Sequence, residues 1–243
     1  MTTTLYQFAL CPFCNKVRAG LQLKGIPFEE VEVSPRSKVE LPPLPEGAPK
    51  KVPVLEVGDT VLWDSTQILS QLDEAFPETV PFIPTDEATR ASADAMEQWV
   101  DEEFIQSLPP VLYGTWREAN KASKIIAKHS RFGAGEGLAV KFGGPVIMHA
   151  VAKRILKRNG RTDAHAWVRE NLDYFERELG ERDFVCGDAL SVADVAMHGA
   201  LTCISAFPIF ENVQSRPRLY AWFERVEAMK EPTAGVAQES RGC

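Results

Sequence analysis

Residues 5–14, LYQFALCPFC, decide the fold, because they run from an apolar strand directly into the first turn of a helix. A strand is predicted at Thr3–Phe8 and a helix after Pro12, since proline suits the first helical position, where its missing N–H leaves no hydrogen bond unmade. This junction places Cys11 at the helix start and Cys14 one turn further in. Unpaired backbone N–H groups and the positive end of the helix dipole favour a thiolate at Cys11, which lowers the pKa of that thiol.

The two cysteines are therefore predicted to be catalytic. Cys11 is expected to attack as a thiolate, and the more shielded Cys14 to act as the resolving thiol. The alternative is a pair of cysteines buried for packing alone, but their place after a strand and at a proline-marked helix start favours the redox interpretation. The remaining cysteines, Cys186, Cys203 and Cys243, are widely scattered, so no structural zinc or other metal site is predicted.

Outward from this turn, the first third of the chain alternates between strand and helix. A second strand is predicted at Phe28–Val33, followed by an irregular loop rich in proline. A hairpin of Val52–Val57 and Thr60–Trp63 turns at Gly58-Asp59, and a helix follows from Ser65. The predicted order is βαβββα, an α+β arrangement.

Beyond about Glu87 the strand patterns stop and helical periodicity takes over. Apolar residues spaced four, three and four apart predict a buried stripe on a helix from about Thr162 to Gly180: Val168, Leu172, Phe175 and Leu179. Ser191-Val-Ala-Asp194 has the pattern of a capping box and opens a helix through Ile204. Trp222, Phe223 and Val226 place a last helix before Pro232. Three prolines between residues 77 and 85 mark a boundary, which gives an N-terminal domain at 1–78 and an all-helical domain at 86–232.

Composition excludes several classes of protein. A net charge of −7 and a pI near 5.3 argue against a nucleic-acid binder, because phosphate affinity comes from clustered Lys and Arg. The one basic cluster, at positions 153–161, is interpreted as a solvated helix face. No apolar run reaches the roughly 20 residues of a membrane span, and Met1–Tyr6 lack the start of a secretory signal. We therefore expect a soluble, cytoplasmic protein without an integral membrane segment.

Two further segments fit one ligand. In Lys51-Val52-Pro53-Val54 a proline opens a strand, where a cis peptide bond can turn backbone groups outward and an extended peptide can pair with Val52. Asp64 and Ser65 begin a helix, and capping is their simplest role. In the functional interpretation, the helix N-terminus and the Ser65 hydroxyl hold a carboxylate while Asp64 holds an ammonium. Both groups occur on the γ-glutamyl end of glutathione.

The first 80 or so residues resemble the thioredoxin-fold domain of the glutathione transferase superfamily, with a glutaredoxin-like Cys-Pro-Phe-Cys turn. Ser191-Val-Ala-Asp194 resembles the capping motif of that superfamily's helical domain. Within it, the chain is most similar to the membrane-associated prostaglandin E synthases of type 2, on matches that cover most of its length: Leu5-Tyr6-Gln7, Cys11–Cys14, Lys16-Val17-Arg18-Ala19, Lys51-Val52-Pro53, Phe132–Gly137, Lys141, Gly144, Met148 and Lys153-Arg154.

The resemblance implies a thioredoxin-like N-terminal domain followed by an all-α C-terminal bundle, a possible homodimer, and glutathione as cosubstrate. The residues expected to bind glutathione are Phe13, Lys51, Val52, Pro53, Asp64 and Ser65. In two respects the sequence departs from the family. Phe8 replaces a family tyrosine, so any role of that hydroxyl is lost. The sequence opens on its first predicted strand, so we do not expect an N-terminal membrane anchor like that of the animal protein.

These features favour glutathione-dependent thiol transfer, in which Cys11 attacks a small electrophile, a disulfide or a lipid peroxide and is released by glutathione or Cys14. An isomerase of a lipid endoperoxide would use the same thiolate on another substrate. A third possibility is a non-catalytic protein that holds glutathione together with haem or an iron–sulfur centre through Cys11. The glycine-rich block around residues 132–144 is interpreted as structural, with the wall of an apolar pocket as the alternative.

Overall fold

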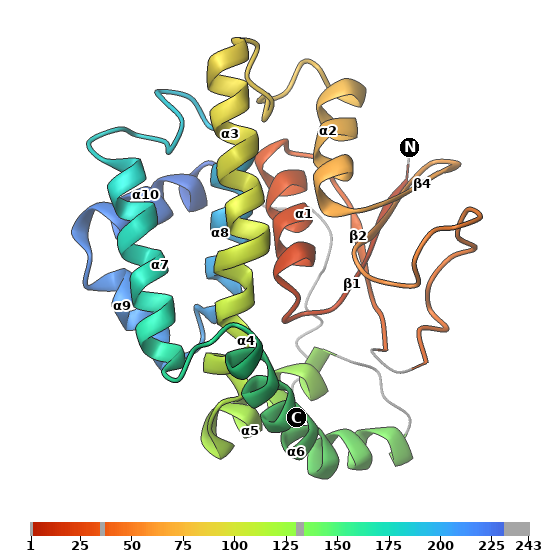
Figure 1. Ribbon diagram of the computed structural model, residues 1–243. Coiled ribbons are helices and arrows are strands. Elements are labelled where there is room, and N and C mark those ends of the chain that lie inside the picture. The colour runs from red at the N-terminus through yellow and green to blue at the C-terminus, as the bar shows by residue number, and fades with distance from the viewer. Residues whose placement is uncertain (1, 35–36, 130–133, 231–243) are drawn as a thin grey trace, which may run out of the picture.

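The computed structural model describes residues 2–34, 37–129 and 134–230. A four-stranded mixed sheet occupies one side of the molecule, and helices fill the other (Figure 1). The first elements are β1 (Thr3–Gln7), α1 (Pro12–Leu23), β2 (Glu29–Glu32), β3 (Val54–Val57), β4 (Thr60–Trp63) and α2 (Ser65–Ala75).

The sheet has the strand order β2-β1-β3-β4, with β1 at its centre. β1 pairs in parallel with β2, and the α1 crossover between them makes this a βαβ unit. β3 pairs antiparallel with both β1 and β4, in a hairpin around Gly58. This is a thioredoxin-like unit, as predicted. The predicted strands were longer than the observed ones: β1 ends at Gln7 rather than Phe8, β2 spans Glu29–Glu32 rather than Phe28–Val33, and β3 begins at Val54 rather than Val52, which lies outside the ladder.

The rest of the described chain is helical and covers the face of the sheet that carries α1 and α2 (Figure 1). It consists of α3 (Glu87–Trp99), a π-helical turn η1 (Val100–Phe104), α4 (Ile105–Tyr113), α5 (Trp116–His129), α6 (Ala134–Arg158), α7 (Ala164–Leu179), α8 (Val192–Ile204), η2 (Pro208–Phe210), α9 (Glu211–Gln214) and α10 (Pro217–Ala228). The predicted domain limits at residues 78 and 86 stay a prediction. Phe132 and Gly133 of the glycine-rich block lie outside the described residues.

The helical part docks onto the sheet part through the contact between α1 and α8. The backbones come close at Gly199, where an added Cβ would lie 2.5 Å from the backbone nitrogen of Lys16. Any side chain there would push the two helices apart. The core is continuous from the sheet through α1 and α8 into the helical layer, where the predicted stripe Val168, Leu172, Phe175 and Leu179 is fully buried.

Asp194 fixes the start of α8 at the centre of this core. Its buried carboxylate accepts hydrogen bonds from the Ser191 N–H (3.0 Å) and the Ser191 hydroxyl (2.8 Å), as the capping motif predicts. It also accepts from the Val185 N–H and from Trp222 Nε1, each at 2.9 Å. The capping residue therefore ties together the loop before α8, α8 itself and α10.

No helix within the described ranges is both long and apolar enough to cross a lipid bilayer.

Candidate functional site

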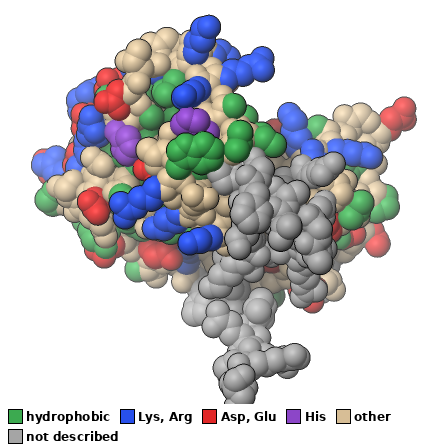
Figure 2. Space-filling view, turned by 90° about the horizontal axis from the view of Figure 1, so that it is seen from below, with side chains coloured by type: hydrophobic (Ala, Val, Ile, Leu, Met, Phe, Trp, Pro, Cys, Tyr) green, Lys and Arg blue, Asp and Glu red, His purple; other side chains and the backbone are tan. Residues whose placement is uncertain are grey.

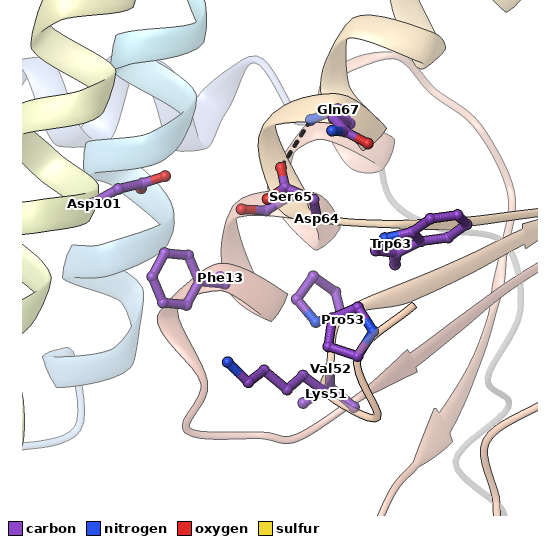
Figure 3. Close-up of a pocket in the computed structure, with 10 residues that line it drawn as sticks. Phe13, Lys51, Val52, Pro53, Trp63, Asp64, Ser65, Gln67 and Asp101 are labelled. Carbon is purple, nitrogen blue, oxygen red and sulfur yellow. Dashed lines mark hydrogen bonds between the residues drawn. The ribbon is translucent and has the colours of Figure 1, made fainter. Parts of the chain in front are cut away.

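One cavity of about 360 Å³ collects all six residues that the sequence assigns to ligand binding. It lies where the start of α1, the loop before β3 and the start of α2 meet the helical part of the chain (Figure 3). Its walls are formed by Phe13, Pro49, Lys51, Val52, Pro53, Trp63, Asp64, Ser65, Gln67 and Asp101. Cys11 and Cys14 are not among them; the cavity reaches the cysteine turn at Phe13.

The cysteine turn has the geometry that activates its first thiol. Cys11 is the N-cap of α1, is partly exposed, and is followed by Pro12 at the first helical position. Interaction with the Cys14 thiol and with the backbone N–H groups of Cys14 and Phe13 stabilises a thiolate at Cys11. These donors, with the charge of Arg18, lower the pKa of Cys11 although partial burial acts against them.

Cys14 has the opposite electrostatic environment. Its thiol is fully buried in the first turn of α1, and burial, together with the hydrogen bond to Cys11, holds its pKa well above the ordinary value. When the pair loses its first proton, the negative charge therefore lies on Cys11, the more accessible sulfur. Phe8, which replaces the family tyrosine, packs against the core, and its backbone carbonyl accepts a hydrogen bond from the Cys11 N–H at 2.9 Å.

Asp64 is the N-cap of α2 and also lines the cavity. Its Oδ1 accepts the backbone N–H groups of Thr66 (3.0 Å) and Gln67 (3.2 Å), which satisfies donors at the start of α2. Asp64 nevertheless has φ = 75° and ψ = 118°, a backbone conformation that few residues other than glycine adopt. Strain of this kind persists where the surrounding structure requires it and gathers at functional sites. Ser65, beside it, is the first residue of α2.

The helical part contributes a second carboxylate, Asp101, which no pattern in the sequence indicated. Asp101 lies in the π-helical turn η1, and such turns often occur at functional sites inside longer helices. Its Oδ2 binds the ammonium of Lys16 at 2.9 Å. Its Oδ1 is buried and has no hydrogen-bond partner within the described chain, at the wall of the cavity. Burial raises the pKa of Asp101, and the Lys16 charge opposes that shift.

Lys16 organises this side of the cavity. Its side chain is completely buried, and its Nζ contacts Glu97 Oε1 at 2.5 Å and Thr66 Oγ1 at 3.1 Å in addition to Asp101. Thr66 Oγ1 in turn donates to Glu97 at 2.7 Å. The network connects α1 and α2 to α3 and η1, and its two carboxylates outnumber its one ammonium. The surroundings of Asp101 therefore favour a further cation on the cavity side.

Charges of both signs face this cavity. Lys51 extends its ammonium toward Phe13 on one wall, whereas Asp64 and Asp101 lie on the opposite side (Figure 3). The N-terminus of α2, at Ser65, adds a positive dipole end. A ligand with two carboxylates and one ammonium finds complementary groups here.

Four wall residues were not predicted: Pro49, Trp63, Gln67 and Asp101. The first three lie within two residues of predicted ones, so their proximity along the chain could have suggested them. Asp101 had no such signal. Among the described residues, no three His, Cys, Asp or Glu side chains converge as metal ligands.

Two family models match the chain. The model described as "Glutathione S-transferase, N-terminal domain" matches residues 5–80, and "Glutathione S-transferase, C-terminal domain" matches residues 157–230. Prostaglandin E synthase 2 of Mus musculus is 25% identical, over 99% of this chain and 73% of the relative. The same-named protein of Danio rerio is 27% identical, over 92% and 70%. FtsZ-localized protein A of Caulobacter vibrioides is 29% identical, over 84% and 78%.

Solved structures share the fold at low sequence identity. Glutathione transferase F7 of Populus trichocarpa superposes with a TM-score of 0.63 at 19% identity, over 93% of this chain and 94% of that one. A glutathione S-transferase of Methylobacterium radiotolerans, solved with glutathione sulfonate, gives a TM-score of 0.60 at 23% identity, over 98% and 99%.

Proposed function

Since this chain belongs to the glutathione transferase superfamily, we propose that it is a glutathione-dependent thiol transferase whose nucleophile is the Cys11 thiolate. One observation carries the proposal: a cavity with charges complementary to glutathione adjoins a cysteine pair whose pKa values are driven apart. Transferase activity with glutathione follows from the family, whereas the cysteine mechanism is our inference from this site.

In the proposed binding mode, the γ-glutamyl end of glutathione occupies the start of α2. Its carboxylate accepts from Ser65 and the helix N-terminus, and its ammonium lies between Asp64 and Asp101. The middle of the peptide runs beside Val52 in extended form, and Lys51 neutralises the glycine carboxylate. The cysteine sulfur then extends past Phe13 toward Cys11.

The proposed reaction exchanges one disulfide for another. The Cys11 thiolate attacks the glutathione sulfur of a mixed disulfide, a Cys11–glutathione bond forms, and the other thiol leaves as a thiolate that takes a proton from water. A second glutathione thiolate attacks the adduct, which yields oxidised glutathione and restores Cys11. With a protein disulfide, the Cys11 thiolate forms a mixed disulfide with one substrate sulfur and releases the other as a thiol. Cys14 then attacks Cys11, which frees the second substrate thiol and leaves a Cys11–Cys14 disulfide that two glutathione molecules reduce. The high pKa of Cys14 keeps this thiol protonated until Cys11 has formed the mixed disulfide.

The pH dependence of alkylation tests the state of Cys11. Its lowered pKa predicts that iodoacetamide labelling of Cys11 rises with pH at a midpoint below the ~8.5 of a free cysteine, because only the thiolate reacts. Cys186 serves as an internal control, since burial raises its pKa and its labelling should begin at higher pH. Peptide mass spectrometry separates the two sites. A Cys11 midpoint at or above that of Cys186 contradicts the assignment.

Asp64→Asn separates ligand binding from capping. Asparagine caps helices as well as aspartate and tolerates positive φ, so α2 should keep its stability. The loss of the charge should weaken glutathione binding by about tenfold, since a charge-assisted contact contributes roughly 1.5–3 kcal/mol. Calorimetric titration with glutathione measures the affinity, and thermal unfolding checks the cap. If Asp64→Asn binds glutathione as the wild type does, Asp64 is a cap alone.

A lipid endoperoxide isomerase is a second candidate, favoured because the similarity to prostaglandin E synthase 2 extends over nearly the whole chain. The same thiolate would act on a peroxide oxygen instead of a sulfur. Turnover of a lipid endoperoxide and of a small mixed disulfide by one preparation distinguishes the two functions. Activity with the endoperoxide alone would replace the thiol-transfer proposal.

A further inference from the structure

Helices α5 and α6 form a hairpin whose charge is opposite to that of the rest of the protein. Residues 115–162 contain eleven Lys and Arg but only two acidic residues, whereas the remaining chain has sixteen basic and 32 acidic residues. Most of this segment falls between the two stretches that the family models match. The hairpin lies at one end of the molecule, beyond α4 (Figure 1). Its strong positive charge is not used by the glutathione site.

The hairpin also carries most of the exposed large apolar side chains of the described chain. Ile147 is 64% exposed, Trp116 and Val146 are 55% exposed, and Val151 is 39% exposed; elsewhere only Val39 and Met229 are comparable. Trp116 of α5 stacks on His149 of α6 with ring centroids 5.8 Å apart, so the indole belongs to the same surface as the α6 residues. Figure 2 shows hydrophobic, Lys and Arg side chains gathered on this face of the molecule.

The exposed apolar side chains and the basic side chains lie on the same face of α6, one group after the other along the helix axis. With about 100° between successive residues, Val146, Ile147 and Val151 point to the same side of α6 as the exposed basic residues that follow, Lys153, Arg154, Lys157 and Arg158. The two groups are centred roughly 10 Å apart along the axis, at 1.5 Å per residue. Lys153, Arg154 and Lys157 form no ion pair within the described chain. Their charges are therefore available to an external anionic partner.

We propose that the α5–α6 hairpin docks the protein onto the surface of an anionic lipid bilayer. If α6 lies along the bilayer surface, the apolar groups of this face can insert ~5–10 Å into the membrane. The long Lys and Arg side chains of the same face can reach the lipid phosphates beside them. A second copy of the chain does not suit this face, because two hairpins of like charge repel each other. A nucleic acid would pair with the cations but leave Val146, Ile147 and Val151 in water. The anionic bilayer satisfies both sets of side chains.

Vesicle flotation tests the docking. The full chain should float with phosphatidylcholine vesicles that contain about one third phosphatidylglycerol, and binding should fall between about 0.05 M and 0.5 M salt, where the charges are screened. Ile147→Asp and the pair Lys153→Glu with Lys157→Glu should each lower the partition coefficient at least tenfold. The matched controls are Val39→Asp, at another exposed valine, and Arg90→Glu with Arg169→Glu, which changes the net charge equally. Both controls should bind anionic vesicles markedly better than the hairpin variants.

Tryptophan fluorescence of the wild-type protein gives a measurement of docking that does not depend on the charge-reversal variants or on Ile147→Asp. Lipids brominated in the acyl chains should quench part of the tryptophan emission, and Trp116→Phe should remove that quenching. Three results would overturn the proposal. The protein could fail to bind anionic vesicles, it could bind pure phosphatidylcholine vesicles equally well, or the control variants could weaken binding as much as the hairpin variants do. Binding to duplex DNA that survives Ile147→Asp, with no vesicle binding, would replace the bilayer with a nucleic acid.

Discussion

Cys11→Ser should abolish the transfer of glutathione from a small mixed disulfide, with turnover lowered by about a thousandfold or more. Serine keeps the shape of the side chain but is not ionised at neutral pH, so the helix start and the Cys14 thiol have no thiolate to stabilise. The covalent route is then closed. Glutathione-coupled turnover measures the loss, and calorimetry should show that glutathione still binds, because the cavity walls do not include Cys11.

Cys14→Ser is the matched control and should behave differently. The small mixed disulfide needs only the attacking thiolate, since free glutathione releases Cys11 afterwards, so much of this activity should remain. A glutathione adduct on Cys11 should accumulate and be visible by intact mass. Reduction of an internal protein disulfide needs the resolving thiol and should fall in both variants. An active Cys11→Ser beside an inactive Cys14→Ser would reverse the two roles, and two fully active variants would exclude thiol transfer.

Asp194→Ala should produce the largest loss of stability, lowering the free energy of unfolding by about 3–5 kcal/mol. The change leaves the Val185 and Ser191 N–H groups and Trp222 Nε1 buried without an acceptor, at roughly 1–3 kcal/mol each before relaxation. It also removes the cap of α8, which holds the helical part against α1. Urea unfolding followed by circular dichroism measures the effect.

Asp188→Ala provides the control, because Asp188 is exposed in the loop that precedes the same helix. Its loss should change the free energy of unfolding by less than about 0.5 kcal/mol. If the two variants unfold at the same urea concentration, the hydrogen bonds of Asp194 contribute little, and the start of α8 is held by apolar packing.

Local patterns in the sequence determined most of the secondary structure of this protein. Pro12 begins α1, the Gly58 turn sets β3 against β4, and the Ser191–Asp194 cap begins α8. Each of these features depends on groups within a few residues of one another, and residue type is sufficient to identify them. The same holds for Asp64 and Ser65 at the start of α2. Boundaries were less certain: α7 begins at Ala164, two residues later than predicted, because Asp163 supplies the cap.

The tertiary structure alone decided which charges meet at the cavity. Lys16 contacts Glu97 and Asp101 across separations of 81 and 85 residues, and no local pattern connects them. The π-helical turn that carries Asp101 likewise has no residue signature within α3 and α4. The packing of α6 against α4 and α5 also decides which face of α6 is exposed, and the composition of the segment does not show this. Spacing along the chain determines which hydrogen bonds a turn or cap can make, whereas the partners of a buried charge depend on how distant helices pack.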